Sequence, residues 1–256
     1  EFLYQRGRPP KATYTFKHAL VQDNAYESML RSVRVRIHRG LADALLEEFP
    51  EAAAAQPELV AQHFAAAGES ARAVQWYGKA GESAVQRSAN AEAMHHFHKA
   101  LELMEQLPGY GDDAPRELRE MELGFQLGMG QALTNSRGYA APEVAEVYGR
   151  AHTLVGRLGD SPQRFPVLWG LWVFYQTRSQ LDRAVELAER LMQLAPEILD
   201  HTGDDGMLLE AHASLGATHF VRGEFAESLE HLLEAISLYD AEKHHPHAYM
   251  FGHDPG

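Results

Sequence analysis

Two stretches of the chain share one pattern of small and bulky residues 44 positions apart, and this spacing most constrains the fold. Two further stretches, 60–80 and 127–151, follow a similar pattern. Repetition at a long fixed period indicates one supersecondary unit stacked several times, because such a unit buries its apolar face only against a neighbouring copy. The positions that match in register are Leu168, Leu171, Tyr175, Ala184, Ala188 and Leu191 in one copy and His212, Leu215, His219, Ser228, Leu232 and Ala235 in the next.

Apolar residues within these stretches recur at helical intervals. Met94, Phe97, Leu101 and Met104 follow one another at i, i+3, i+7 and i+10 and form a single stripe. No run alternates between apolar and polar residues, as a half-buried strand does. The sequence therefore predicts an all-α protein of roughly ten to twelve helices. The prolines expected to separate them are Pro50, Pro57, Pro108, Pro115, Pro142, Pro162, Pro166, Pro196 and Pro246.

Charge is distributed unevenly along the 256 residues. The first forty residues have a net charge of +5 and the remainder a net charge of −18, for a total of −13. An acidic body repels phosphate backbones, so no nucleic-acid partner is expected. We expect Arg31, Arg34, Arg36 and Arg39 to form a solvated helix face, or a face against a neighbouring acidic or nucleotide-binding module.

Several classes of chemistry are excluded by the residues. The chain has no cysteine, which rules out disulfides, thiolate metal sites and cysteine nucleophiles. It has no GxxxxGK[ST], GxGxxG after a strand, GxSxG or HExxH motif. We expect no catalytic, cofactor-binding or metal-binding residue in this chain, and no cofactor. The longest apolar run, 165–175, is shorter than the roughly 20 residues that a membrane helix needs, and no secretory segment begins the chain, so a cytoplasmic location is expected.

Three histidines in four positions, His95, His96 and His98, raise the question of a metal site. On a helix, Ala93, Phe97 and Ala100 share the packing face and the histidines lie beside it. No HxxxH pair or flanking carboxylate completes a set of ligands. We expect partly solvated neighbours of a core stripe, with His95 near Glu92 or Lys99.

Other polar clusters have weaker or different explanations. The pairs Asp112–Asp113 and Asp204–Asp205 lie in glycine-bearing stretches and are expected to be solvated turns. The C-terminal stretch has better ligand chemistry but lies around a proline, so either adventitious nickel or zinc binding or a plain polar loop is expected there. Its candidate ligands are His244, His245, His247, His253 and Asp254.

The repeated pattern resembles tetratricopeptide repeats, in which small residues mark the close contact of paired helices. The resemblance implies a right-handed superhelix of antiparallel helix pairs over 51–256. The tryptophan expected at the start of the first helix is missing from every copy. The spacing of about 40 to 44 residues also exceeds the roughly 34 of the standard unit, as in the larger repeats of bacterial signalling ATPases.

A second resemblance rests on the stretch YTFKHALVQDNAYESML, Tyr14 to Leu30. It resembles the junction after the winged-helix region of bacterial STAND (AAA-type) signal-transduction ATPases, which often carry a class III adenylate or guanylate cyclase domain. PELVAQHFAAAG, RSANAEA, RGYAAPEVAEVY, FPVLWGLW and LEAHASLGATHF agree with that group. The resemblance implies a helical junction over 1–50 and a chain that is one piece of a longer protein, with repeats truncated at the C-terminal end.

These observations favour a non-catalytic regulatory module that binds a protein or peptide, or the upstream ATPase or cyclase domains. A small-molecule sensor using Trp169, Trp172, Tyr175 and His219 is the alternative, and a free-standing helical enzyme is a remote one. Self-association through the C-terminal repeat face is also expected. The repeat pattern places a largely apolar concave groove, which would hold a hydrophobic peptide unless its residues are buried between helices, at Phe125, Met129, Trp169, Val173, Gln176, Ala213, Ala217 and Phe220.

Overall fold

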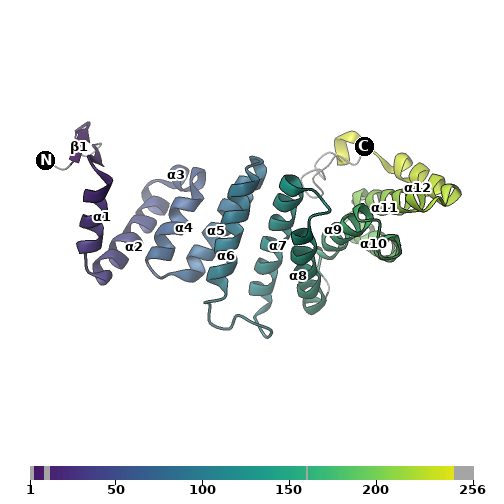
Figure 1. Ribbon diagram of the computed structural model, residues 1–256, viewed down its shortest axis with the longest axis horizontal. Coiled ribbons are helices and arrows are strands. Elements are labelled where there is room, and N and C mark those ends of the chain that lie inside the picture. The colour runs from purple at the N-terminus through teal and green to yellow at the C-terminus, as the bar shows by residue number, and fades with distance from the viewer. Residues whose placement is uncertain (1–2, 9–11, 160, 245–256) are drawn as a thin grey trace. The chain divides into compact units, whose positions relative to one another are not determined.

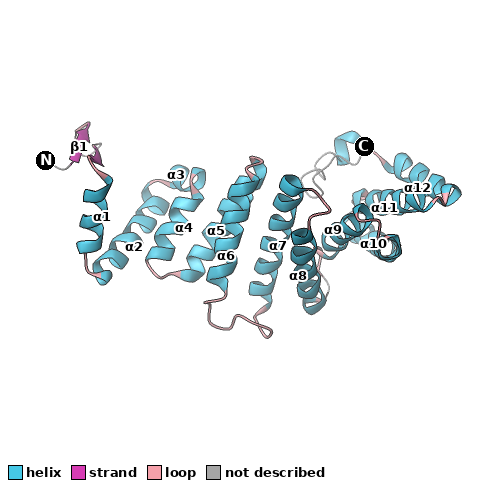
Figure 2. Ribbon diagram, in the orientation of Figure 1, coloured by secondary structure: helices cyan, strands magenta, loops and turns pink. Residues whose placement is uncertain are grey.

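The structure is a computed structural model that describes residues 3–8, 12–159 and 161–244. Figure 1 labels its helices and strands in chain order, and Figure 2 colours them by type. The described part of the chain is an all-α helical-repeat protein with a single small hairpin, which confirms the predicted fold class. The helices are α1 (Ala19–Ser28), α2 (Arg31–Glu48), α3 (Pro50–Ala55), α4 (Pro57–Ala66), α5 (Ser70–Gln86), α6 (Asn90–Met104), α7 (Arg116–Arg137), α8 (Pro142–Leu158), α9 (Arg164–Thr177), α10 (Leu181–Thr202), α11 (Gly206–Arg222), α12 (Phe225–Leu238) and α13 (Ala241–His244).

The hairpin was not predicted from the sequence. Strand β1 (Leu3–Arg6) pairs antiparallel with β2 (Thr13–Phe16), with Leu3 opposite Phe16 and Arg6 opposite Thr13. Figure 2 shows it in magenta, before the first helix. All four β1 residues are exposed, so the strand lacks the alternation of buried and solvated positions that marks a strand in a sequence.

The helix boundaries follow local rules of backbone chemistry. Pro50, Pro57 and Pro142 are the first residues of their helices, where the missing N–H costs no hydrogen bond. Gly203 and Gly223 end α10 and α11 in the left-handed conformation that glycine adopts without strain.

Pro196 departs from the expected pattern. It was expected to separate two helices, but α10 continues through it to Thr202. A proline inside a helix removes one backbone hydrogen bond. Ala195 is fully buried beside it and Leu191 is fully buried one turn earlier, so packing of α10 on the core offsets that loss.

The packing divides the chain into two compact units, residues 1–76 and 77–256. In the first unit α2 packs against α3 and α4, around buried Ala42, Val60 and Phe64. The boundary predicted at residue 50 lies inside this unit, and the division into a junction and a repeat region stays a prediction.

The arginines of α2 are partly paired within the first unit. Arg34 forms an ion pair with Glu27 at 2.9 Å, and Arg39 forms one with Glu69. Arg31 and Arg36 are exposed. Arg31 and Arg36 therefore lie on a solvated helix face, as one of the two predictions stated. Arg34 and Arg39 are instead paired with carboxylates of the same unit.

In the second unit each helix from α6 to α11 packs against the next, and α9 also contacts α7 and α11. Aromatic rings from one helix lie against glycines of its neighbours. A Cβ atom added to Gly81 of α5 or to Gly128 of α7 would lie 2.5 Å from the ring of Phe97. Glycine at these positions therefore allows the helices to approach each other around a buried ring.

Tyr148 of α8 is held in the same way. An added Cβ would lie 2.8 Å from its ring at Gly130 of α7 and 2.2 Å at Gly170 of α9. The ring is almost fully buried, and burial raises the pKa of its hydroxyl. In the next helix pair, a Cβ atom added to Gly216 of α11 would lie 2.7 Å from the side chain of Leu232 of α12.

None of the helices in the described part of the chain combines the length and the hydrophobicity that crossing a bilayer requires.

We predict that Gly170→Ala destabilises the protein by about 1–3 kcal/mol, because its methyl group overlaps the buried Tyr148 ring and forces the helices apart. The matched control is Gly156→Ala in α8, where an added Cβ meets nothing within 4 Å. This control should stabilise the helix by up to about 1 kcal/mol. Urea denaturation followed by circular dichroism measures both variants, and equal stabilities would contradict the role of the glycine–ring contact.

Candidate functional site

The eight residues predicted to line a groove lie on α7, α9 and α11, but they do not form one open surface. Phe125, Trp169 and Val173 are buried, with 5%, 5% and 8% of their surfaces exposed. Phe220 is 60% exposed. The other four, Met129, Gln176, Ala213 and Ala217, are half-buried. Three of the predicted groove residues therefore belong to the core, and a partner-binding role for the others stays a prediction.

Burial of the three core residues follows from contacts between neighbouring helices. The Phe125 ring lies 6.0 Å from that of Phe97 and fills the space over Gly78. The Trp169 ring lies 6.1 Å from Trp172 and 6.4 Å from Tyr139. The rings thus pack within two separate groups, and in each the predicted groove residue is covered by its neighbours.

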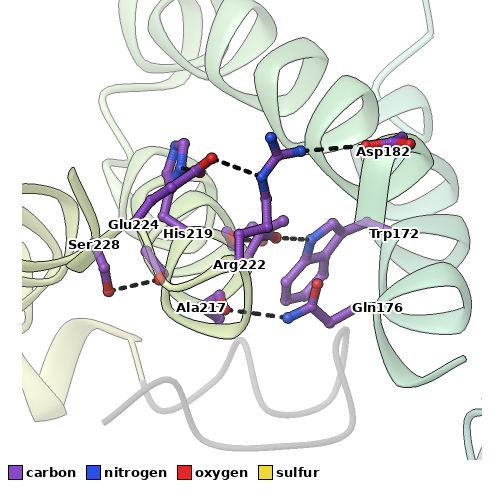
Figure 3. Close-up of polar contacts among 11 residues, drawn as sticks. Trp172, Gln176, Asp182, Ala217, His219, Arg222, Glu224 and Ser228 are labelled. Atoms are coloured by element: carbon purple, nitrogen blue, oxygen red, sulfur yellow. Dashed lines mark hydrogen bonds and ion pairs between the residues drawn. The ribbon is translucent and has the colours of Figure 1, made fainter. Parts of the chain in front are cut away.

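Hydrogen bonds join α9 to α11 directly. The Trp172 indole N–H donates to the Thr218 hydroxyl at 2.9 Å. The Gln176 amide donates to the Ala217 carbonyl at 3.2 Å (Figure 3). Gln176 and Ala217 thus lie close together, as predicted, but they bond to each other across the two helices. The surface between α9 and α11 is closed by its own side chains.

The side chains proposed for a small-molecule sensor are also engaged within the protein. The Arg183 guanidinium donates to the Tyr175 hydroxyl at 3.1 Å. His219 contacts the Glu224 carboxylate at 2.7 Å, and its ring stacks on His231 at 5.8 Å. Together with the burial of Trp169 and Trp172, these contacts argue against a ligand pocket at this place.

An apolar stripe on α12 occupies the C-terminal repeat face that was expected to be exposed, but the sequence analysis had named only its member Phe220. Its side chains are 52–70% exposed, and the α12 members recur at i, i+4, i+8 and i+11. The phenyl rings of Phe220 and Phe225 touch edge to face at 5.8 Å. We call this surface the α12 stripe, and its members are Phe220 and Val221 from the end of α11 and Phe225, Leu229, Leu233 and Ile236 from α12.

Helix α12 is acidic. Helix α12 contains Glu227, Glu230 and Glu234, all exposed, and no lysine or arginine. An adjoining face of the helix, with Ser228 and Ala235, is buried against α11. Helix α12 therefore has one apolar face for the core and a second one that faces outward.

Glu210 is an acid inside the core. Only 2% of its surface is exposed, and its carboxylate accepts a hydrogen bond from the Trp169 indole N–H at 3.2 Å. Burial raises the pKa of Glu210 to about 7, and the hydrogen bond from Trp169 offsets part of this shift. At neutral pH the protein therefore holds this carboxyl group in both its charged and neutral forms.

The three clustered histidines lie beside the core stripe, as predicted. Ala93, Phe97 and Ala100 are buried, whereas His95 and His98 are exposed. His98 pairs with Glu102 at 3.1 Å, and the half-buried His96 stacks on Tyr77 at 6.1 Å. The predicted contact of His95 with Glu92 or Lys99 is replaced by an edge contact with His96 at 5.6 Å.

The two acid pairs differ from each other. Asp112 is exposed and pairs with Arg157 at 2.6 Å. Asp205 is only half-exposed and bonds to Lys243 and His244, so the prediction of a solvated turn is wrong for this residue. The hydrogen bond from Lys243 lowers the pKa of the Asp205 carboxyl to about 2.

Asp204, Asp205 and His244 have potential metal-ligating atoms within 4.8 Å of one another, the only such group among the described residues. The His244 Nδ1 accepts the backbone N–H of Asp240 at 3.1 Å, so its Nε2 carries the proton that it donates to Asp205 at 2.9 Å. Both ring nitrogens are therefore used, and the group ties α11 to α13. The other predicted ligands, His245, His247, His253 and Asp254, lie outside the described residues.

We predict that Glu210→Gln stabilises the protein at pH 8 by about 2–3 kcal/mol. Between an unfolded-chain pKa of 4.5 and a folded pKa of about 7, the folded state holds a proton that the unfolded state has lost, so stability falls as the pH rises. Glutamine keeps an acceptor for Trp169 without the charge. The gain should shrink to near zero by about pH 4.5, where the glutamate is neutral in both states.

Urea denaturation of the two proteins at several pH values measures this difference. Glu189→Gln, at an exposed position of α10, is the control and should have the same stability as the unmodified protein throughout. A Glu210→Gln effect that does not change with pH would show that the carboxyl group does not titrate in the folded protein.

Comparison with known proteins supports the fold and shows no family. No family model matches the chain. The uncharacterized protein R02095 of Rhizobium meliloti (strain 1021) is 28% identical over 258 residues, which cover 99% of this chain and 24% of that protein. The chain therefore spans about a quarter of the length of that relative.

Among solved structures, the crystal structure of BtubC (BKLC) from P. vanneervenii is similar to this chain. The TM-score is 0.57 at 18% sequence identity, and the match covers 94% of this chain and 95% of that one. This similarity concerns the helical fold alone.

Proposed function

We propose that this chain is a non-catalytic interaction module and that its α12 stripe binds an amphipathic helix of a partner protein. The observation that carries the proposal is the stripe itself: six large apolar side chains, each at least half exposed, four on one face of α12 and two at the end of α11. Exposed apolar patches of this kind mark interaction sites in soluble proteins. Positions at i, i+4, i+8 and i+11 match the way one helix packs on another.

The chemistry of the partner follows from the charges around the stripe. Glu227, Glu230 and Glu234 make α12 acidic without a compensating cation on the same helix, and Glu230 lies nearest to the stripe. A partner helix with an apolar face flanked by lysine or arginine satisfies both the apolar and the charged surface. A second copy of α12 would bring like charges together, so a basic partner helix is favoured over self-association.

The module is proposed to belong to a longer signalling protein. The support is the resemblance to STAND ATPases, often fused to nucleotide cyclases, and a relative in which the matching region takes up about a quarter of the length. In such a protein the module would regulate the ATPase or cyclase domain by holding a helix of that domain or of a partner. An antibody against this chain should detect a native protein several times heavier than the 256-residue chain, and a band at the mass of the chain alone would contradict this part of the proposal.

We predict that the chain binds a synthetic amphipathic helix with a leucine face and lysine flanks, and that Leu229→Asp with Leu233→Asp weakens this binding at least about tenfold by placing charges in the apolar contact. Isothermal titration calorimetry measures the affinity. The matched control is Leu20→Asp, which places a charge at another exposed leucine, 75% exposed on α1, and should leave the affinity unchanged.

Three outcomes separate the occupants of the stripe. Preference for lysine over glutamate flanks supports the basic partner helix. Equal binding of both peptides, or binding that the double variant retains, contradicts it. A dimer of the isolated chain in light scattering that the double variant abolishes would show that a second copy occupies the stripe instead.

A further inference from the structure

A groove of about 720 Å³ lies between α8 and α10, beside the first residue of α9. Small-molecule sites in proteins have volumes of roughly 300–1,000 Å³, so this groove has the size of a metabolite site. It shares no residue with the α12 stripe or with the predicted groove on α7, α9 and α11. No role described so far involves it.

Two arginines without a partner line this groove. Arg164 and Arg190 are both exposed, and the guanidinium group of neither forms a hydrogen bond or an ion pair with a described residue. Every other arginine described beyond residue 40 is held by a carboxylate, a carbonyl or a hydroxyl: Arg72, Arg87, Arg116, Arg119, Arg137, Arg150, Arg157, Arg178, Arg183 and Arg222. The two free guanidinium groups of this part of the chain are therefore at the same place.

The charge of the groove is opposite to that of the chain. Besides the two arginines, its titratable groups are His152 and Glu197, both exposed, and Glu197 forms no ion pair with either arginine. The groove is thus positive in a protein with a net charge of −13. A guanidinium group binds carboxylate and phosphate oxygens through two parallel hydrogen bonds. The first turn of α9, which begins at Arg164, adds the positive end of a helix dipole.

Gln193, three apolar side chains and two glycines complete the groove. Val155 and Leu168 are almost fully buried and Leu194 is half-buried, and all three line it. Gly156 and Gly159 contribute no side chain, and a Cβ added to either would meet nothing within 4 Å. The same groove therefore offers two guanidinium groups and three apolar side chains to a ligand.

We propose that this groove binds a small organic anion, with its carboxylate or phosphate group on Arg164 and Arg190 and its apolar body against Val155, Leu168 and Leu194. The site is independent of the interaction proposed for the α12 stripe. It gives the module a place to receive a chemical signal that does not compete with a protein partner for the same surface.

Binding of octanoate and of octyl phosphate to the full chain, measured by calorimetry, tests the proposal, with octylammonium as a cation of the same chain length. We expect saturable binding of at least one of the two anions and none of the cation. Arg164→Gln with Arg190→Gln should weaken the binding about tenfold or more, because both charge-assisted contacts are lost. Arg36→Gln, which removes an exposed arginine of α2, should leave the affinity unchanged.

A second pair of variants keeps the test valid if the arginine variants fold poorly. Gly156→Leu places a side chain in the groove, whereas Gly149→Leu places one on the same helix outside it, and neither added Cβ meets another atom within 4 Å. We expect Gly156→Leu to abolish anion binding and Gly149→Leu to retain it.

Several results would overturn the proposal. These are the absence of saturable binding by both anions, equal binding of octylammonium, and binding that survives both the arginine pair and Gly156→Leu. Loss of anion binding in the Leu229→Asp and Leu233→Asp double variant would place the ligand on the α12 stripe instead. Anion binding that this double variant retains supports the groove even if no peptide binds the stripe.

Discussion

The contact of a buried aromatic ring with glycines of the helices on either side is the interaction on which the second unit depends. Phe97 lies against Gly81 and Gly128, and Tyr148 lies against Gly130 and Gly170. Each ring fills the volume that two missing side chains leave, so successive helices approach closely without a cavity. Gly216 and Leu232 are packed in the same way, with the leucine side chain in the space that the glycine leaves.

Close approach of the helices also determines where function is located. Because α9 lies next to α11, Trp169 and Trp172 are buried and bonded to Glu210 and Thr218. The surface where a helical-repeat protein was expected to hold a peptide is thereby filled. Free surface remains at the α12 stripe and at the groove beside Arg164 and Arg190, one apolar and the other positive.

The fold was predictable because helical periodicity and small-residue positions are local properties of the sequence. Small residues were expected where paired helices touch closely, and Gly128 and Gly216 each lie against a side chain of a neighbouring helix. The groove predicted on α7, α9 and α11 was wrong in part, because the burial of Trp169 depends on how closely α9 and α11 approach. The Trp169–Glu210 contact joins residues 41 positions apart. The free guanidinium groups of Arg164 and Arg190 are recognised only once the structure shows a partner for each of the other described arginines beyond residue 40.

Phe97 of α6 links three helices, because its ring packs against Gly81 of α5 and Gly128 of α7. A smaller residue at this position leaves two voids, and a larger residue at either glycine displaces the ring from both. Positions 81, 97 and 128 are thus coupled as a set during evolutionary divergence. Related chains are expected to keep all three residues or to change them together, so that a large side chain on one of the helices again faces small residues on its neighbours.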